Sequence, residues 1–344
     1  MAIPAISKIR EIHKDKEFIL ITNRSAKVNH VTAWDVLKHT GYFKDVIYYN
    51  TSDIKGLLKL ALQLRNFSKN ILYYLTPVRS RVQAIRDYIF FKFICSIDKI
   101  FCVEDSIQKY IVRDKDGNLI KVENEFERLL KIIYKVHKLD YKKNNIQFPL
   151  LFPPKEAYEK ISNLLKDSFT EDKIFIAIGH GSKIPATKWD LNRFKKLCNL
   201  LLNFDERISL VIFGGENDFK SGEYLREGFE KRSINLCGKT NIIESAAAIS
   251  KCVLFVGNDS GPLHLAASMG IPCVGIYSAR DNPGRWEPYG NNHIVLRENV
   301  ECEGCFLEEC IVNKMKCLYM ITAEEVFLAV VHKFNYIDWH NELS

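Results

Sequence analysis

The chain alternates short apolar runs with amphipathic stretches, a pattern typical of an α/β protein. In its second half, continuous apolar runs predict strands that are buried on both faces, as in a parallel sheet. These runs are Ile174–Ile178, Leu210–Phe213, Cys252–Val256 and Pro272–Tyr277. Helices are predicted at Lys155–Ser168, Ile243–Ile249, Pro262–Met269 and Ile321–Phe334. We therefore expect a sheet of parallel strands connected by helices.

The first half alternates less regularly. It opens on an amphipathic helix, Ala2–His13, with Pro4 near its start. Strands are predicted at Phe18–Thr22, Val46–Tyr49 and Asn70–Leu75. An α/β nucleotide-binding domain normally begins with a strand and a Gly-rich turn instead of a helix. The first strand and loop of the domain are therefore missing from this pattern.

Length supports two domains, because 344 residues exceed what one ordinary core contains. The best candidate for a linker is Lys142–Pro154, which is polar at first and then contains several prolines. We therefore expect an N-terminal domain over residues 1–150 and a second domain over residues 151–322.

Composition narrows the class of protein. Apolar residues make up 47% and charged residues 26%, as in soluble globular proteins. No apolar run is long enough to span a membrane, and the first residues lack a signal-peptide pattern, so we expect a cytoplasmic protein. The net charge of +7 favours an anionic partner, but no nucleic-acid-binding motif is present. Six cysteines lie in apolar surroundings, as expected of buried thiols in a reducing compartment. They are Cys95, Cys102, Cys198, Cys237, Cys252 and Cys273.

The stretch Phe255–Gly290 contains the clearest candidate site. A buried strand runs into the turn Gly257–Gly261, and a helix follows directly. Backbone N–H groups and the positive end of the helix dipole make such a turn an anion site. Asp259 and Ser260 add polar side chains there, and His264 lies one helical turn further on. His264 could contact a bound phosphate or only hold the loop.

The segment Asp259–Ala267, DSGPLHLAA, resembles the D-[TS]-G-x-x-H-L-A-A signature of glycosyltransferase family 9, which includes the heptosyltransferases. The similarity extends from about Ala2 to about Val331. It implies a GT-B architecture, in which two Rossmann-like domains face a cleft and the C-terminal segment, residues 323–344, returns to the first domain. It also implies an inverting, metal-independent sugar transfer that requires no cofactor.

The donor implied by the resemblance is a nucleotide-diphosphate sugar carrying heptose or a related sugar. The acceptor would be lipopolysaccharide or another surface glycan or glycolipid. Such an enzyme would act in the cytoplasm or at the inner face of the cytoplasmic membrane, with at most peripheral membrane contact.

Further loops at the carboxyl ends of predicted strands resemble donor-site elements of the family. Gly179–Ser182 resembles a P-G-[AS] turn, and Thr187–Trp189 resembles a K-x-W element in which Lys188 supplies charge to a diphosphate. The Asn235–Thr240 loop, with Lys239, resembles N-L-x-G-K-T and is expected on the base-binding side. The predicted donor-binding residues are Gly181, Ser182, Thr187, Lys188, Glu216, Lys239, Asp259, Ser260, Gly261, His264 and Arg280.

Two of these assignments have open alternatives. Glu216 or the nearby Asp218 could bind ribose hydroxyls, or either could be a solvated loop acid. Arg280 and Arg285 lie in a segment that departs from the common family form. They could bind the donor phosphates or pair with neighbouring acids. These acids are Asp281 and Glu287.

The catalytic residue is unknown from this sequence. In the heptosyltransferases the proposed general base is an Asp in a loop before a helix like Pro4-Ala5-Ile6, so the resemblance places the base upstream of Met1. Either the start lies upstream, the sequence is truncated, or the base has been lost. In the last case the protein would be an inactive nucleotide-sugar-binding protein. A nucleotide-sugar epimerase is a third possibility, but no convincing acid and histidine set for it is present in the first domain.

Two further features have more than one interpretation. Cys302, Cys305, Cys310 and Cys317 could hold a structural zinc or be free or redox-labile thiols. The helix at Val78–Cys95 is rich in basic and aromatic residues. It could approach a membrane surface or an anionic acceptor. The sequence alone favours the alternative, a helix whose apolar side faces the core.

Overall fold

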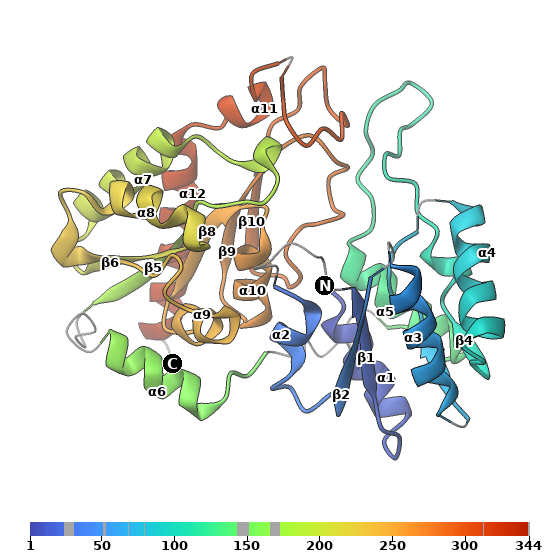
Figure 1. The fold of residues 1–344 in the computed structure, drawn as a ribbon. Coiled ribbons are helices and arrows are strands. Elements are labelled where there is room, and N and C mark those ends of the chain that lie inside the picture. The colour runs from blue at the N-terminus through green and yellow to red at the C-terminus, as the bar shows by residue number, and fades with distance from the viewer. Residues whose placement is uncertain are drawn as a thin grey trace. The chain divides into compact units, whose positions relative to one another are not determined.

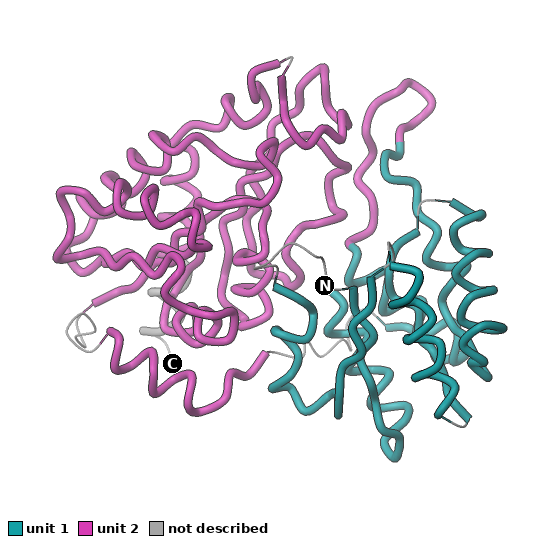
Figure 2. Tube along the Cα trace, viewed as in Figure 1, with its two compact units in different colours: residues 1–112, 125–149 teal, residues 113–124, 150–344 magenta. Residues whose placement is uncertain are grey.

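The computed structural model describes residues 1–23, 31–50, 53–67, 69–78, 80–142, 151–165, 173–311 and 313–342, with side chains as far as residue 334. The chain divides into two compact units (Figures 1 and 2). Unit 1 contains residues 1–112 and 125–149, and unit 2 contains residues 113–124 and 150–344. Most of the predicted linker Lys142–Pro154 lies outside the described residues.

The division differs from the predicted one in two places. Residues 113–124 join unit 2, where the Val122 N–H donates to the Pro283 carbonyl at 2.9 Å. The C-terminal helix α12, Ala323–Glu342, also belongs to unit 2 and buries Val326 and Val330 in its core. The described side chains of residues 323–344 therefore pack on the second unit, whereas the sequence predicted a return to the first.

Unit 2 is built on one parallel sheet of six strands in the order β10-β9-β8-β5-β6-β7. Its strands are β5 Ile174–Gly179, β6 Ile208–Phe213, β7 Ser233–Asn235, β8 Leu254–Asn258, β9 Cys273–Tyr277 and β10 His293–Arg297. Every residue of β6, β8 and β9 is buried. Strands covered on both faces need apolar side chains at consecutive positions, which explains the continuous runs in the sequence.

Helices cover this sheet (Figure 1). They are α6 Lys155–Leu164, α7 Leu191–Phe204, α8 Phe219–Arg226, α9 Ile242–Ile249, α10 Gly261–Ser268, α11 Lys316–Tyr319 and α12. Helices α7 and α12 share one core with the strands, to which they contribute Leu197, Leu201, Val326 and Val330. Helix α10 packs on β8, β9 and α9. These helices bury the strands that carry the candidate site.

The strand order reverses between β5 and β8. The chain passes from β5 to β6 and β7 in one direction, then returns to place β8 on the other side of β5. Gly179 of β5 pairs with Phe213 of β6 and with Gly257 of β8, so the carboxyl ends of these strands meet at one edge. Open α/β sheets bind ligands at such a reversal, outside the carboxyl ends of the strands.

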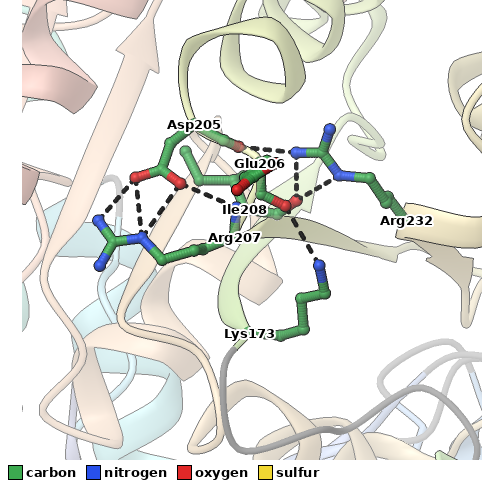
Figure 3. Close-up of polar contacts among 6 residues, drawn as sticks. All are labelled: Lys173, Asp205, Glu206, Arg207, Ile208 and Arg232. Atoms are coloured by element: carbon green, nitrogen blue, oxygen red, sulfur yellow. Dashed lines mark hydrogen bonds and ion pairs between the residues drawn. The ribbon is translucent and has the colours of Figure 1, made fainter.

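At the amino ends of the strands, opposite their carboxyl ends, a network of polar contacts surrounds the start of β6 (Figure 3). The Arg232 guanidinium donates to the carbonyls of Leu202, Asp205 and Ile208, at distances between 2.7 and 3.1 Å. Leu202 lies in the last turn of α7, where carbonyls lack helical partners. The side chain of Asp205 pairs with Arg207 at 2.7 Å, and this contact lowers the pKa of Asp205. Because Ile208 begins β6, this network stabilises the end of the sheet that is remote from the candidate site.

Replacement of Arg232 by methionine should lower the free energy of unfolding by about 2 kcal/mol, because hydrogen bonds from a charged donor to three carbonyls are lost. Chemical denaturation of the variant measures the loss. The neighbouring exposed Lys231 is the matched control, and Lys231→Met should leave stability unchanged. An Arg232→Met protein with the same free energy of unfolding as the wild type would show that the network does not stabilise this end of the sheet.

Unit 1 contains two separate parallel pairs, β1 Ile19–Asn23 with β2 Asp45–Tyr49, and β3 Ile71–Tyr73 with β4 Lys99–Phe101. Its helices are α1 Ile3–Ile12, α2 Ala33–Leu37, α3 Ile54–Arg65, α4 Arg81–Ile89 and α5 Glu125–Val136. A π-helical turn, η1 Phe90–Ile94, extends α4. The predicted opening helix and the three predicted strands of this half are therefore confirmed, with shifted ends.

The two pairs of unit 1 belong to one layer. Ile21 of β1 and Leu72 of β3 pack on the same apolar cluster beneath α3 and η1, while Leu20 and Leu75 pack together beneath α1. Within the described ranges no hydrogen bond joins β1 to β3.

Across the described residues, no helix has both the length and the apolar composition required to cross a membrane.

Candidate active site

Asn258, the last residue of β8, organises the candidate site. Its side chain is fully buried and donates from Nδ2 to the His180 carbonyl at 2.7 Å. Its Oδ1 accepts a hydrogen bond from the Trp189 backbone N–H at 3.0 Å. One side chain therefore joins the loop after β5 and the segment before α7 to the end of β8. Asn258 was not among the residues predicted from the sequence. Its polar side chain, placed between a buried strand and the Asp259–Gly261 turn, could have indicated a role in the site.

The turn Asp259–Gly261 leads into α10. Ser260 occupies the N-cap position, but its side chain makes no capping hydrogen bond. Both Ser260 Oγ and His264 Nδ1 are buried and lack a hydrogen-bond partner among the described residues. Beside Gly261, a β-carbon would meet no atom within 4 Å. Buried polar atoms normally have partners, so unpaired ones beside open space and a helix N-terminus indicate a ligand site.

Asp259 and His264 face each other within this turn. The Asp259 Oδ1 lies 3.5 Å from His264 Nε2, and both side chains are about one-fifth exposed, at 22% each. The Asp259 carboxylate therefore faces the Nε2 side of the His264 ring, and the Nδ1 atom lies on the side of the ring away from this carboxylate. Of the predicted site residues, Asp259, Ser260, Gly261 and His264 therefore lie together at the sheet reversal.

The loop after β5 supplies the next group. Ser182 Oγ and Thr187 Oγ1 are 2.7 Å apart, and Thr187 Oγ1 also donates to the Ile184 carbonyl at 2.9 Å. Lys188 follows the short helix Pro185–Thr187 and is exposed, next to the residue whose N–H binds Asn258. The two hydroxyl groups thus close the loop, while Lys188 extends from it beside the end of β8.

His180 lies at the start of this loop and is buried. Burial lowers its pKa, and the nearby Asp218 carboxylate only partly opposes this effect. The ring Nε2 is 2.7 Å from Ser221 Oγ. Asp218 also contacts Gly181, because a β-carbon on Gly181 would lie 2.5 Å from Asp218 Oδ2. Gly181 is therefore needed for the close packing of the loops after β5 and β6.

The two acids of the loop after β6, Asp218 and Glu216, have different surroundings in the structure. Asp218 Oδ2 accepts the Gly215 N–H at 2.9 Å, so this carboxylate closes its own turn. Glu216 is exposed, and its Cα would lie 2.9 Å from a β-carbon on Gly238, which has a positive φ of 69°. Glu216 thus lies against the loop of Lys239, whose Nζ is 5.3 Å from the Phe219 ring. Of the two acids, Glu216 has the accessible carboxylate.

The family profile described as glycosyltransferase family 9 (heptosyltransferase) matches residues 119–316, more than half of the chain. The chain belongs to glycosyltransferase family 9. It is therefore a glycosyltransferase, as the Asp259–Ala267 signature indicated.

Individual relatives extend the comparison beyond this region. Lipooligosaccharide heptosyltransferase 2 of Campylobacter jejuni is 25% identical over 342 residues, which cover 95% of this chain and 91% of the relative. The structure of E. coli ADP-heptose lps heptosyltransferase II superposes with a TM-score of 0.67 and 18% identity, covering 98% of this chain and 94% of that one. The structure of the glycosyl transferase family 9 protein of Veillonella parvula superposes with a TM-score of 0.70 and 20% sequence identity. The match covers 96% of this chain and 91% of that one. The fold is thus the GT-B fold that the sequence predicted.

The contacts of Arg280 in the structure differ from the donor phosphates and neighbouring acids that the sequence suggested as its partners. Its Nε donates to the Leu307 carbonyl at 2.7 Å, and its guanidinium lies 4.7 Å from the Phe306 ring. Arg285 is buried with its Nε 3.5 Å from Asp281 Oδ1, which is one of the predicted acid pairings. In this family 9 chain, Arg280 therefore holds the segment that follows β10, and its part in phosphate binding stays a prediction.

The four cysteines of this segment do not form a metal site in the structure. Across the described ranges no three Cys, His, Asp or Glu side chains lie together as a metal site requires, so zinc is not supported. Cys310 Sγ accepts the Met315 N–H at 3.3 Å, and Cys305 is exposed. Cys302 and Cys317 are half-buried. The pKa of the Cys317 thiol is raised chiefly by burial and also by Cys302 and Cys310 nearby, so these cysteines lie in one region of unit 2 without forming a metal site.

Proposed function

We propose that this family 9 enzyme transfers heptose from ADP-heptose to a sugar of the lipopolysaccharide core. The observation that carries the proposal is the pair of unpaired buried atoms, Ser260 Oγ and His264 Nδ1, at the N-terminus of α10 and at the sheet reversal. An anionic ligand would supply their partners. The name of the similar E. coli enzyme includes ADP-heptose, which supports this choice of donor.

The surrounding loops provide a distinct contact for each part of the donor. Lys188 and the Asp259–Gly261 turn would bind the diphosphate, because one supplies a positive charge and the other backbone N–H groups. The accessible Glu216 would bind ribose hydroxyls, and the loop carrying Lys239 would line the adenine. Gly181, Ser182 and Thr187 would shape the phosphate loop. Arg280 holds the segment after β10 through the Leu307 carbonyl, and that segment meets the phosphate loop where the Glu308 carbonyl accepts the Ala186 N–H.

The reaction we propose is a single displacement that inverts the anomeric carbon. The acceptor hydroxyl oxygen attacks this carbon, and its proton passes to a general base. The bond between the anomeric carbon and the diphosphate oxygen breaks, so ADP leaves with added negative charge. Lys188 and the N-terminus of α10 would stabilise that charge without a divalent metal.

Calorimetric titration with ADP, GDP, UDP and CDP, with and without Mg²⁺, tests the proposal. We expect ADP to bind in the absence of metal and Asp259→Ala to abolish binding. Glu227→Ala, which removes an exposed carboxylate from the same unit, is the control and should bind normally. Absence of nucleotide binding by the folded protein would refute the donor site. ADP-heptose binding without transfer to a heptose-deficient core acceptor would support the inactive alternative.

A further inference from the structure

Two neighbouring helices of unit 1 expose apolar side chains that a soluble helix normally buries. On α3 these are Ile54, Leu58 and Leu62, spaced four residues apart and therefore on one face of the helix. On α4 and the π-helical turn they are Val82, Ile85, Ile89 and Phe93. The seven side chains are between 47% and 77% exposed. Single exposed apolar residues are common, but two stripes of them need an explanation.

The sequence alone favoured a core-facing apolar side for the second helix. The structure shows that core-facing side, on which Ala84 of α4 and Phe91 of the π-helical turn are buried, but it also leaves a second set of apolar side chains exposed. In this turn the Cys95 N–H donates to the Phe90 carbonyl, five residues earlier. Phe91 is buried in the core of unit 1, whereas Phe93 is 67% exposed. Such turns inside helices occur frequently at functional sites.

The two stripes lie on the same side of unit 1. Leu60 and Leu64 of α3 share one core cluster with Phe91 and Cys95. The Arg65 Nε also donates to the Ile94 carbonyl at 2.8 Å, which fixes the end of α3 beside the π-helical turn. Both helices therefore cover the same face of the strands. We call these seven side chains the α3–α4 surface (helices labelled in Figure 1).

Basic residues surround this surface. Between residues 53 and 94 the sequence has eight Lys or Arg and two Asp, in a chain whose net charge is +7. Lys55, Lys59 and Arg81 are exposed on the same helices. Asp87 accepts hydrogen bonds from Arg86 and Tyr74, so its negative charge is engaged locally. The region thus has a net charge of +6, against +7 for the whole chain, because the charges of the remaining residues nearly cancel.

We propose that the α3–α4 surface docks on the surface of an anionic lipid bilayer. Apolar side chains on helices that lie flat would enter the boundary of the acyl chains, and the flanking bases would contact anionic headgroups. A second copy of the chain fits less well, because two surfaces of the same strong positive charge would face each other. The proposal extends the proposed function by placing the enzyme at a membrane independently of donor and acceptor.

Sedimentation of the full chain with lipid vesicles tests this docking. We expect binding to vesicles containing phosphatidylglycerol, weak binding to pure phosphatidylcholine, and loss of affinity as ionic strength rises from roughly 0.1 to 1 M. The variants Leu58→Gln/Leu62→Gln and Lys55→Glu/Lys59→Glu should each bind about tenfold more weakly or worse. Val82→Gln/Ile85→Gln repeats the apolar test on the second helix.

Matched control pairs come from exposed positions of unit 2. Leu164→Gln/Leu328→Gln and Lys220→Glu/Lys231→Glu should bind vesicles like the wild type. No binding to anionic vesicles, or equal losses in the control pairs, would overturn the proposal. A dimer that becomes monomeric in Leu58→Gln/Leu62→Gln would assign the surface to a second copy and overturn it as well. ADP titration of each variant separates these outcomes from failure of the donor site.

Discussion

Replacing Asn258 with alanine should lower the free energy of unfolding by about 3 kcal/mol and should weaken ADP binding by about a hundredfold. The side chain is fully buried, and its removal leaves the His180 carbonyl and the Trp189 N–H without their partner. Both groups belong to segments that carry predicted donor contacts. Loss of the side chain therefore destabilises the fold and also releases the loop of Lys188 from the end of β8.

Chemical denaturation and calorimetric titration with ADP measure the two effects separately. Asn192→Ala is a suitable control, because Asn192 also accepts a side-chain hydrogen bond, from Tyr224, but at an exposed position. It should change stability by less than about 0.5 kcal/mol and leave ADP binding intact. Normal ADP affinity in a folded Asn258→Ala protein would show that the tie between the loops is not needed for the donor site.

The second large effect is expected at Lys188. Lys188→Met should reduce heptosyl transfer about tenfold or more, because a positive charge near the leaving diphosphate is removed. Lys188 is exposed, so the melting temperature should not change. Lys188→Arg retains the charge and should recover part of the activity. Steady-state kinetics with ADP-heptose and a core acceptor measures these rates.

Lys251 provides the matched control for this substitution. It is an exposed lysine of the same unit, but it follows α9 and precedes β8, at the edge of the sheet away from the site. Lys251→Met should transfer sugar at the wild-type rate. Full activity in Lys188→Met would exclude a phosphate role for this residue, while equal losses in both variants would indicate a general effect of charge.

The parts of the site that could be predicted are local in sequence. Asp259, Ser260, Gly261 and His264 form one turn and the first turn of one helix, so their positions follow from a strand that ends and a helix that begins. Glu216 follows the predicted strand Leu210–Phe213 for the same reason, whereas Lys239 was placed by the family resemblance of its loop. The common edge that brings these loops together required only the assumption that the strands are parallel.

The parts that were missed or misjudged depend on contacts between distant residues. Asn258 binds groups 69 and 78 residues away, which no local pattern indicates. Arg280 binds carbonyls 26 and 27 residues along the chain, although acids near it in sequence seemed better partners. The cysteine spacing permitted a zinc site, but spacing does not determine whether the sulfur atoms take up the geometry that a metal ion requires.

By itself the sequence indicated the family through the resemblance of Asp259–Ala267 to the family signature. It also determined the α/β class, most strands and the turn that begins α10, because apolar runs and helix-start residues act over a few neighbouring positions. Only the tertiary structure decided which unit residues 113–124 join, which acid of the loop after β6 remains accessible, and which face of α4 is left uncovered. A helix with apolar side chains on two sides can bury only the one that meets a neighbour. For α4 that neighbour covers Ala84, and Val82, Ile85 and Ile89 remain outside.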